Sequence, residues 1–194
     1  MSGHLGINVD IASTVFRKGS ISVIDYLFEL LGCRNIQDLE RLPRLHLRIK
    51  EVLKGVSVVT THRGDQKVRF KVAIVNEETP NSKRFEDRDS GKEMSISDYF
   101  KSQYNISLKY PNLPLAFKAN GKTAFPLECL MIAPAQRFMK RLSPQQTSDM
   151  IKATTQRPDD RLRAINDACE TTLKFKENPY MKSFGLEVKD KMVR

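Results

Sequence analysis

Aromatic and basic side chains are interleaved through the middle of the chain, and these two residue types together can hold single-stranded RNA. Bases stack on aromatic rings, while cations and hydroxyl donors contact the phosphates. The rings of this region are Phe70, Phe85, Tyr99, Phe100, Tyr104, Tyr110 and Phe125, and the cations are Lys67, Arg69, Lys71, Lys101, Lys109 and Lys122. The alternative is that the rings form a core, which we favour for Phe100 and Tyr110. Phe85 fits a core less well because the sequence around it is polar.

Catalytic chemistry has little support in the sequence. Glycine-rich phosphate loops, paired-histidine zinc motifs and serine-nucleophile motifs are all absent. Only His62 falls where a predicted strand meets a basic turn, and a lone histidine is most often structural or exposed. Cys33, Cys129 and Cys169 are far apart and form no C-x-x-C pair, which argues against a disulfide framework and against a zinc site. We therefore expect no catalytic residue, no metal and no cofactor.

Composition limits the class of protein. The 194 residues include 33 Lys and Arg against 23 Asp and Glu, so the net charge is +10, which favours an anionic partner such as nucleic acid. With 40% hydrophobic residues the chain can build a core, and its length predicts one domain with appendages or two small ones. No apolar run suits a membrane span and no secretory signal is recognisable. Because the three cysteines are scattered and unpaired in pattern, we expect a reducing compartment, cytoplasmic or nuclear or both. Residues 1–4 are typical of a cloning remnant.

Periodicity predicts helices toward both ends and strands between them, an α+β class with a β-rich centre. The predicted helices cover residues 20–32 and 43–55, a short stretch that begins at Ser95, and two further stretches that begin at Ser143 and Pro158. The predicted strands cover residues 56–61, 70–75, 115–118 and 123–132, and residues 76–93 are expected to form a loop or an irregular hairpin. In the last helix we expect Leu162, Ile165 and Cys169 to face inward.

Several short motifs resemble the PAZ domain of eukaryotic Argonaute proteins. They are Thr61-His62-Arg63-Gly64, Asp98-Tyr99-Phe100-Lys101, Tyr110-Pro111-Asn112-Leu113-Pro114 and Pro126-Leu127-Glu128. The segments 135–137, 146–154 and 178–190 resemble the second Argonaute linker, and the segments 8–16 and 23–25 resemble the end of the first linker. The resemblance covers nearly the whole chain in the same order, and it is therefore more specific than any one motif.

The resemblance implies a fold that periodicity alone does not give. A PAZ domain is a small OB-like β-barrel with an inserted appendage, a β-hairpin followed by a helix, and a cleft lies between the two. On this basis residues 1–19 are the end of the first linker, residues 20–133 the PAZ domain, and residues 134–194 a mostly helical second linker. The domains that carry the slicing carboxylates and hold the guide 5′ end are expected outside this sequence, so we do not expect it to cut RNA.

The resemblance also implies a binding site for the two-nucleotide 3′ end of a small RNA. Three family positions hold the phosphate between the last two nucleotides with their polar side-chain tips. In this sequence they match His62, Tyr99 and Tyr104. Phe85 matches the ring that packs on the terminal nucleotide, and the pocket walls match Phe70 and Phe125. A backbone-contacting cation matches Lys122, and the further candidates for backbone contacts are Lys67, Arg69 and Lys101. Tyr99 and Tyr104 are five residues apart, which does not place them on one face of an ideal helix, so the resemblance implies that the helix ends there.

The expected function is that of a non-catalytic module that anchors the 3′ end of a small guide RNA, of the siRNA or microRNA kind, in RNA silencing. The expected partners are that single-stranded end and the remaining Argonaute domains, with no membrane. Two alternatives stay open: the PAZ region of a Dicer-type ribonuclease, and a structural or interaction piece that braces other lobes. The linker residues after Ala135 favour Argonaute over Dicer, and bracing is the role expected of residues 134–194.

Overall fold

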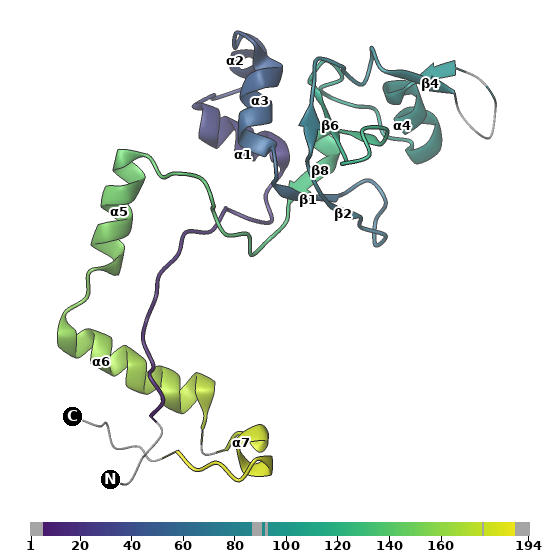
Figure 1. Ribbon diagram of the computed structural model, residues 1–194. Coiled ribbons are helices and arrows are strands. Elements are labelled where there is room, and N and C mark those ends of the chain that lie inside the picture. Colours follow the sequence, from purple (N-terminus) through teal and green to yellow (C-terminus); the bar gives the residue numbers. More distant parts are fainter. Residues whose placement is uncertain (1–5, 87–90, 92, 176, 189–194) are drawn as a thin grey trace. The chain divides into compact units, whose positions relative to one another are not determined.

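The computed structural model describes residues 6–86, 91, 93–175 and 177–188, which fall into two compact units (Figure 1). The larger unit is Phe16–Phe138, and the smaller unit combines the segment up to Val15 with the segment from Met139 onward. The expected cloning remnant, residues 1–4, lies outside the described residues. The predicted linker boundaries after residues 19 and 133 stay predictions.

Three helices open the larger unit: α1 (Val23–Leu31), α2 (Ile36–Glu40) and α3 (Leu45–Leu53). The Ser22 hydroxyl accepts a hydrogen bond from the Asp25 N–H at 3.0 Å, and α1 ends at a glycine in the left-handed region. These contacts confirm the first predicted helix and show that Ser22 caps it. Helix α3 confirms the second one, whereas α2 was not expected because five residues are too few to show a periodic apolar stripe.

The strands of the larger unit pair antiparallel in short, open sheets. One sheet has the order β2 (Arg69–Lys71), β1 (Ser57–Thr60), β8 (Leu130–Ile132). A second sheet has the order β3 (Ile74–Val75), β6 (Leu115–Phe117), β7 (Ala124–Pro126). The mixture of helices and strands confirms the α+β class. These open sheets are compatible with an OB-like fold, and in the described residues their pairing does not close into one ring of strands.

The single strand predicted over residues 70–75 is wrong, because the chain changes sheets in its middle. The Val72 N–H donates to the carbonyl that precedes β1 at 2.9 Å, and the Ala73 N–H donates to the last carbonyl of β6 at 3.0 Å. This crossing reverses the side-chain alternation, so Val75 is buried while Ile74 is 41% exposed. Periodicity could not reveal the crossing because both halves are rich in β-branched and apolar residues.

The strand predicted over residues 123–132 is likewise two strands. Pro126 ends β7, a 3-10 turn follows over Leu127–Cys129, and β8 then joins the other sheet. Proline has no N–H to give to a continuing ladder, which explains the interruption. Asn120 and Gly121 form the turn between β6 and β7: Gly121 has a φ of 64°, and the Asn120 side chain accepts hydrogen bonds from two backbone N–H groups.

An appendage lies between β3 and β6 in the chain and consists of the hairpin β4 (Arg84–Glu86) and β5 (Glu93–Ser95) followed by α4 (Ile96–Tyr104) (Figure 1). The Ser95 hydroxyl caps α4 by accepting a hydrogen bond from the Asp98 N–H at 3.1 Å, as predicted. The loop or irregular hairpin expected before Ser95 therefore contains a paired strand hairpin. The order of hairpin and then helix is the one that the resemblance implied.

Two apolar clusters fill the larger unit. The first joins α1 and α3 to the sheets and includes Leu27 and Ile49, both fully buried. The second joins α4 to β6 and includes Phe100, which is 3% exposed, and Leu115. Burying one such side chain stabilises the fold by about 1.5–3 kcal/mol. The second cluster therefore holds α4 of the appendage against β6. The interpretation of Phe100 as a core residue is confirmed, and Tyr110 is a half-buried residue packed against the first cluster.

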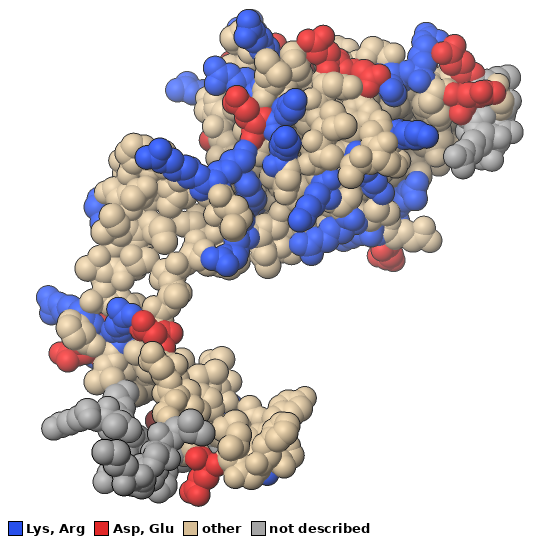
Figure 2. All heavy atoms as spheres, viewed as in Figure 1, with Lys and Arg blue, Asp and Glu red and all other residues tan. Residues whose placement is uncertain are grey.

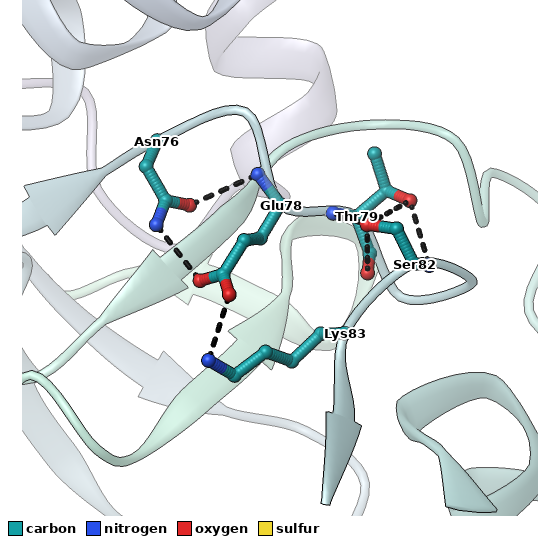
Figure 3. A network of polar contacts seen from close by, with 5 residues as sticks. All are labelled: Asn76, Glu78, Thr79, Ser82 and Lys83. Carbon is teal, nitrogen blue, oxygen red and sulfur yellow. Dashed lines mark hydrogen bonds and ion pairs between the residues drawn. The ribbon is translucent and has the colours of Figure 1, made fainter.

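A polar network ties together the segment that enters the appendage (Figure 3). The Glu78 carboxylate accepts hydrogen bonds from the Asn76 side-chain amide and from the Lys83 ammonium, both at 2.8 Å. Thr79 and Ser82 close a tight turn beside it through their hydroxyls and backbone N–H groups. The pKa of Glu78 is lowered mainly by the hydrogen bond from Lys83 and, next, by the hydrogen bond from Asn76. The network therefore stabilises the ionised carboxylate.

Replacing Glu78 by glutamine is expected to lower the free energy of unfolding by about 0.5–1 kcal/mol at neutral pH, because the ion pair is partly exposed. Because the pKa of Glu78 is lower in the folded than in the unfolded protein, its ionised carboxylate stabilises the fold at pH values above the unfolded pKa of 4.5. This stabilisation is lost as the pH falls through the folded-state pKa. The difference between wild type and variant should therefore shrink in acid. Urea unfolding at neutral and at acid pH measures it, with Glu40→Gln as the matched control, since Glu40 is exposed at the end of α2. An equal difference at both pH values would exclude the ion pair as the cause.

The smaller unit is helical. Its elements are α5 (Pro144–Thr154), α6 (Pro158–Asp167), a π-helical turn (Ala168–Leu173) and α7 (Pro179–Ser183). The predicted starts of α5 and α6 are confirmed, and α5 carries a complete capping box at Ser143. The inward orientation predicted for Leu162 is wrong: its side chain is 43% exposed, and α6 has no buried residue. Within the described parts of the chain, helices with the length and apolarity to cross a membrane are absent.

Candidate nucleic-acid interface

Six rings of the larger unit contact one another in an unbroken line, which we call the ring series. In order, its members are Phe85, Tyr99, Tyr104, His62, Phe125 and Phe70. The centroids of successive rings lie 5.4, 5.8, 4.8, 5.8 and 5.0 Å apart. These are the six rings that the sequence analysis assigned to one site, so the structure brings all of them together.

The ring series joins elements that are far apart in the sequence. The appendage supplies Phe85 from β4 and two tyrosines from α4. The sheets supply Phe70 from β2 and Phe125 from β7, and His62 begins the turn that follows β1. Phe85 was the ring hardest to place in a core, and it packs edge-on against Tyr99 at an interplanar angle of 77°. The appendage and the sheets therefore share one aromatic surface.

The end of α4 explains how Tyr99 and Tyr104 meet although they are five residues apart. Tyr104 is the last helical residue, and Asn105 follows in the left-handed region with a φ of 53°. The Asn105 N–H donates to the carbonyl of Phe100, which closes the helix. The two tyrosine rings then lie edge to face, 5.8 Å apart. The helix end implied by the resemblance is confirmed.

His62 lies at the centre of the ring series and is half-buried. Its ring contacts the rings of Phe100, Tyr104 and Phe125. In the described part of the chain its Nδ1 atom is buried without a hydrogen-bond partner, and such an atom costs about 1–3 kcal/mol. The pKa of His62 is lowered mainly by burial and, to a smaller extent, by the nearby charge of Arg63. The lowered pKa favours a neutral imidazole in the free protein at neutral pH.

The cations predicted from the sequence lie around the ring series rather than on it. Lys67, Arg69, Lys101 and Lys122 are all exposed, and none of them lies over a ring of the described residues. Arg69 belongs to β2, where the alternation of the strand points it away from the side of Phe70. Their role in contacting an RNA backbone stays a prediction.

Two cations that the sequence analysis did not single out do lie on the ring series. The Arg63 guanidinium carbon is 5.8 Å from the centroid of the Tyr104 ring. The Lys118 ammonium is 5.4 Å from the centroid of Phe70 and 5.6 Å from that of Phe125. The position of Arg63 next to His62 was a usable signal. No local pattern could have identified Lys118, because Phe70 lies on β2 in one sheet and Lys118 follows β6 in the other.

Basic side chains gather on the face of the larger unit that carries β1 and β2, where Lys and Arg outnumber Asp and Glu in the space-filling view (Figure 2). The exposed cations between β1 and the end of β2 are Arg63, Lys67, Arg69 and Lys71. A surface of one sign attracts an oppositely charged ligand before contact is made. The charge and the rings of this unit thus favour the same class of ligand, an anionic chain with flat bases.

The thiol and metal chemistry of the described residues is limited. Cys129 is buried in the second apolar cluster, and burial raises the pKa of its thiol to about 12, so it is a core residue. Groups of three or more His, Cys, Asp or Glu side chains arranged to hold a metal ion do not occur in the described residues.

The family model described as "PAZ domain" matches residues 18–151 of this chain. Two curated relatives match almost its whole length. "Protein argonaute PNH1" of Oryza sativa subsp. japonica is 29% identical over 97% of this chain and 19% of its own length. "Protein argonaute" of Schizosaccharomyces pombe is 30% identical over 98% of this chain and 23% of its own length. The chain therefore spans about a fifth of the length of these relatives.

Solved structures are also similar to this chain, and the match with a TM-score above 0.5 shows the fold. The structure of Kluyveromyces polysporus Argonaute with a guide RNA matches 82% of this chain and 18% of that chain, with a TM-score of 0.55 and 23% identity. The Drosophila Argonaute 2 PAZ domain, in a structure that describes 3′ end recognition of nucleic acids, matches 60% of this chain and 96% of that chain, with a TM-score of 0.48 and 24% identity.

Proposed function

We propose, from the premise that this chain belongs to the PAZ domain family, that its larger unit binds the single-stranded 3′ end of a small guide RNA without cutting it. In this proposal the ring series receives the last two nucleotides. His62, Tyr99 and Tyr104 contact the phosphate between them, and Phe85 packs on the terminal nucleotide. The other two phenylalanines of the ring series form the opposite wall of the pocket.

The observation that carries this proposal is the ring series itself. Of its six members only Phe125 is buried, and the other five are half-buried, so parts of their surfaces stay open to a ligand. Each base that stacks on an aromatic side chain contributes about 1–3 kcal/mol, and stacking accepts any base because every base has a flat face. The proposed site therefore has little sequence preference, in contrast to a site that reads base edges.

Argonaute is the parent that we favour over a Dicer-type ribonuclease. The two curated Argonaute relatives match 97% and 98% of the chain, which includes the helical segment after Met139 as well as the larger unit. For that segment we propose the role of a linker that braces other Argonaute domains. Those domains, a role in RNA silencing and a cytoplasmic or nuclear location belong to the same proposal.

The chemistry of the RNA terminus tests this proposal. A pocket that closes over the terminal ribose should prefer a free 3′ end with both the 2′- and 3′-hydroxyls. We expect an RNA with a 3′-phosphate, and one with a terminal 2′-deoxyribose, to bind several-fold more weakly than the unmodified strand. Competition against a labelled single strand measures this with the whole chain.

A 5′-phosphorylated competitor is the matched control, because it adds the same charge at the other end of the strand. If the 3′-phosphate and 5′-phosphate strands compete equally, the binding does not depend on the 3′ end. The proposed function would then be wrong, even if the affinity for RNA is high.

A further inference from the structure

The hairpin turn between β6 and β7 places one cation against the ring series. The Lys118 N–H donates to the Thr123 carbonyl, and the Lys118 carbonyl accepts from the Gly121 N–H, both at 3.0 Å. These two bonds fix the backbone of Lys118 at the end of β6. Its ammonium is thereby held over the rings of Phe70 and Phe125 rather than released into solvent.

The turn after β1 places a second cation against the ring series. The carbonyl of Arg63 accepts a hydrogen bond from the Gln66 N–H at 3.1 Å, which anchors the backbone of this turn. The guanidinium lies over the ring of Tyr104 and contributes to the lowered pKa of His62, so its charge reaches the centre of the ring series.

Both cations lack an acidic partner in the described residues. Other basic side chains of the protein do have one, for example Lys83 with Glu78 and Arg163 with Asp160. An aromatic face attracts a cation through its quadrupole but does not neutralise the charge. Each cation can therefore accept a negatively charged ligand group without losing a protein ion pair.

In the order of the ring series, the members next to His62 are Tyr104 and Phe125, with ring centroids 4.8 and 5.8 Å from that of His62. Arg63 lies over the first of these two rings and Lys118 over the second. A strand whose phosphate meets His62 would carry its neighbouring backbone toward these two positions.

We propose that Arg63 and Lys118 are additional phosphate-binding residues, which contact the backbone of a single-stranded RNA on either side of His62. This inference rests on the proposed function and deepens it. It assigns backbone neutralisation to two cations on the ring series, in addition to the exposed candidates Lys67, Arg69 and Lys101. The opposing view is that both cations only stabilise the rings that they cover.

Salt dependence separates the two views. For single strands, the logarithm of the binding constant falls with the logarithm of the salt concentration with a slope of about −0.7 for each phosphate that the protein neutralises. The double variant Arg63→Gln, Lys118→Met keeps the long side chains over the rings but removes both charges. We expect its slope to be shallower by about 1.4, and its affinity near physiological salt to fall by about tenfold.

A matched control removes the same two residue types elsewhere. Arg48 and Lys50 are both exposed on α3, which contributes no ring to the ring series. Arg48→Gln, Lys50→Met should therefore leave the slope of the wild type unchanged. The conservative double variant Arg63→Lys, Lys118→Arg keeps both charges and should retain the wild-type slope, with circular dichroism confirming that all variants are folded.

The inference is overturned if the charge-removing variant has the wild-type slope, whether or not its affinity falls, because loss of affinity alone would mean that the cations act on packing. An equal change of slope in the α3 control would also overturn it, since net charge alone would then explain the effect. Failure of the proposed function is a separate result, because in that case the wild type itself would show no preference for a free 3′ end.

Discussion

Replacing Phe85 by alanine is expected to weaken binding of a 3′-overhang RNA by roughly 5- to 150-fold, the equivalent of one lost base stack of about 1–3 kcal/mol. Phe85 lies on β4 opposite Met94 and touches the ring series only through Tyr99, so it forms one end of the series. Its side chain packs against the second apolar cluster but is only half-buried, so part of its surface stays open to a terminal base. The loss should be specific to RNAs with a free 3′ end.

Two companion variants separate stacking from folding. Phe85→Tyr keeps a ring of the same size and should retain most of the affinity. Phe184→Ala removes an equally large ring that is 77% exposed in the smaller unit, and it should leave the affinity unchanged. Fluorescence anisotropy with a labelled overhang duplex gives the affinities, and near-ultraviolet circular dichroism checks the fold. A folded Phe85→Ala protein with wild-type affinity would remove Phe85 from the site.

Tyr99 should be coupled to Phe85 in this measurement because their rings are in direct contact. Mutations of contacting residues are generally not additive. We expect the double variant Phe85→Ala, Tyr99→Ala to lose less affinity than the product of the two single losses, since either single change already opens the same pocket.

Removal of the His62 imidazole is the second change with a large expected effect. A hydrogen bond to a charged group contributes about 1.5–3 kcal/mol, so His62→Gln should weaken binding by roughly 10- to 150-fold at acid pH. The imidazole is neutral in the free protein because burial and Arg63 lower its pKa. A bound phosphate favours the protonated ring and raises the pKa in the complex. Binding should therefore take up a proton, and the affinity should increase as pH falls between the raised and the lowered pKa.

The stability of the free protein has the opposite dependence on pH. The unfolded chain protonates His62 near the ordinary value of 6.5, while the folded chain does so only at lower pH. The unfolded state binds more protons in that window, so the free energy of unfolding decreases as pH falls below 6.5. Affinities must therefore be measured where circular dichroism shows a folded protein. His46→Gln is the matched control, because His46 lies on α3 and outside the ring series. A pH dependence that persists in His62→Gln would contradict this role.

The sequence predicts the members of the candidate site better than the paths of the strands. The pattern of aromatic residues among cations pointed to five of the six rings, since their types carry the chemistry regardless of the fold, and the resemblance to the PAZ domain added His62. The capping serines at positions 22, 95 and 143 were also predictable, because a cap depends on neighbours three residues away. The change of sheet between Val72 and Ala73 was not, because it depends on hydrogen bonds to carbonyls that are distant in the sequence.

The difference between local and long-range contacts also explains why the predicted cations are not the ones that lie over the rings. Lys67, Arg69 and Lys101 were candidates because they are close to ring residues in the sequence, but the structure places Arg63 and Lys118 over the rings instead. Lys118 approaches Phe70 only because β6 and β2 belong to sheets that meet around one core. Sequence proximity predicts contacts within a helix or a turn, whereas contacts between sheets depend on the tertiary fold.

The central claim is that this chain recognises the end of an RNA rather than its charge alone. The most direct test compares the affinity for a short RNA duplex with a free two-nucleotide 3′ overhang and for the same duplex with blunt ends, at low and at high salt. We expect a clear preference for the overhang that persists at high salt, because stacking on the ring series is not screened. Equal affinity for the two duplexes, lost to the same extent at high salt, would contradict the claim and leave the net charge of +10 as the whole basis of binding.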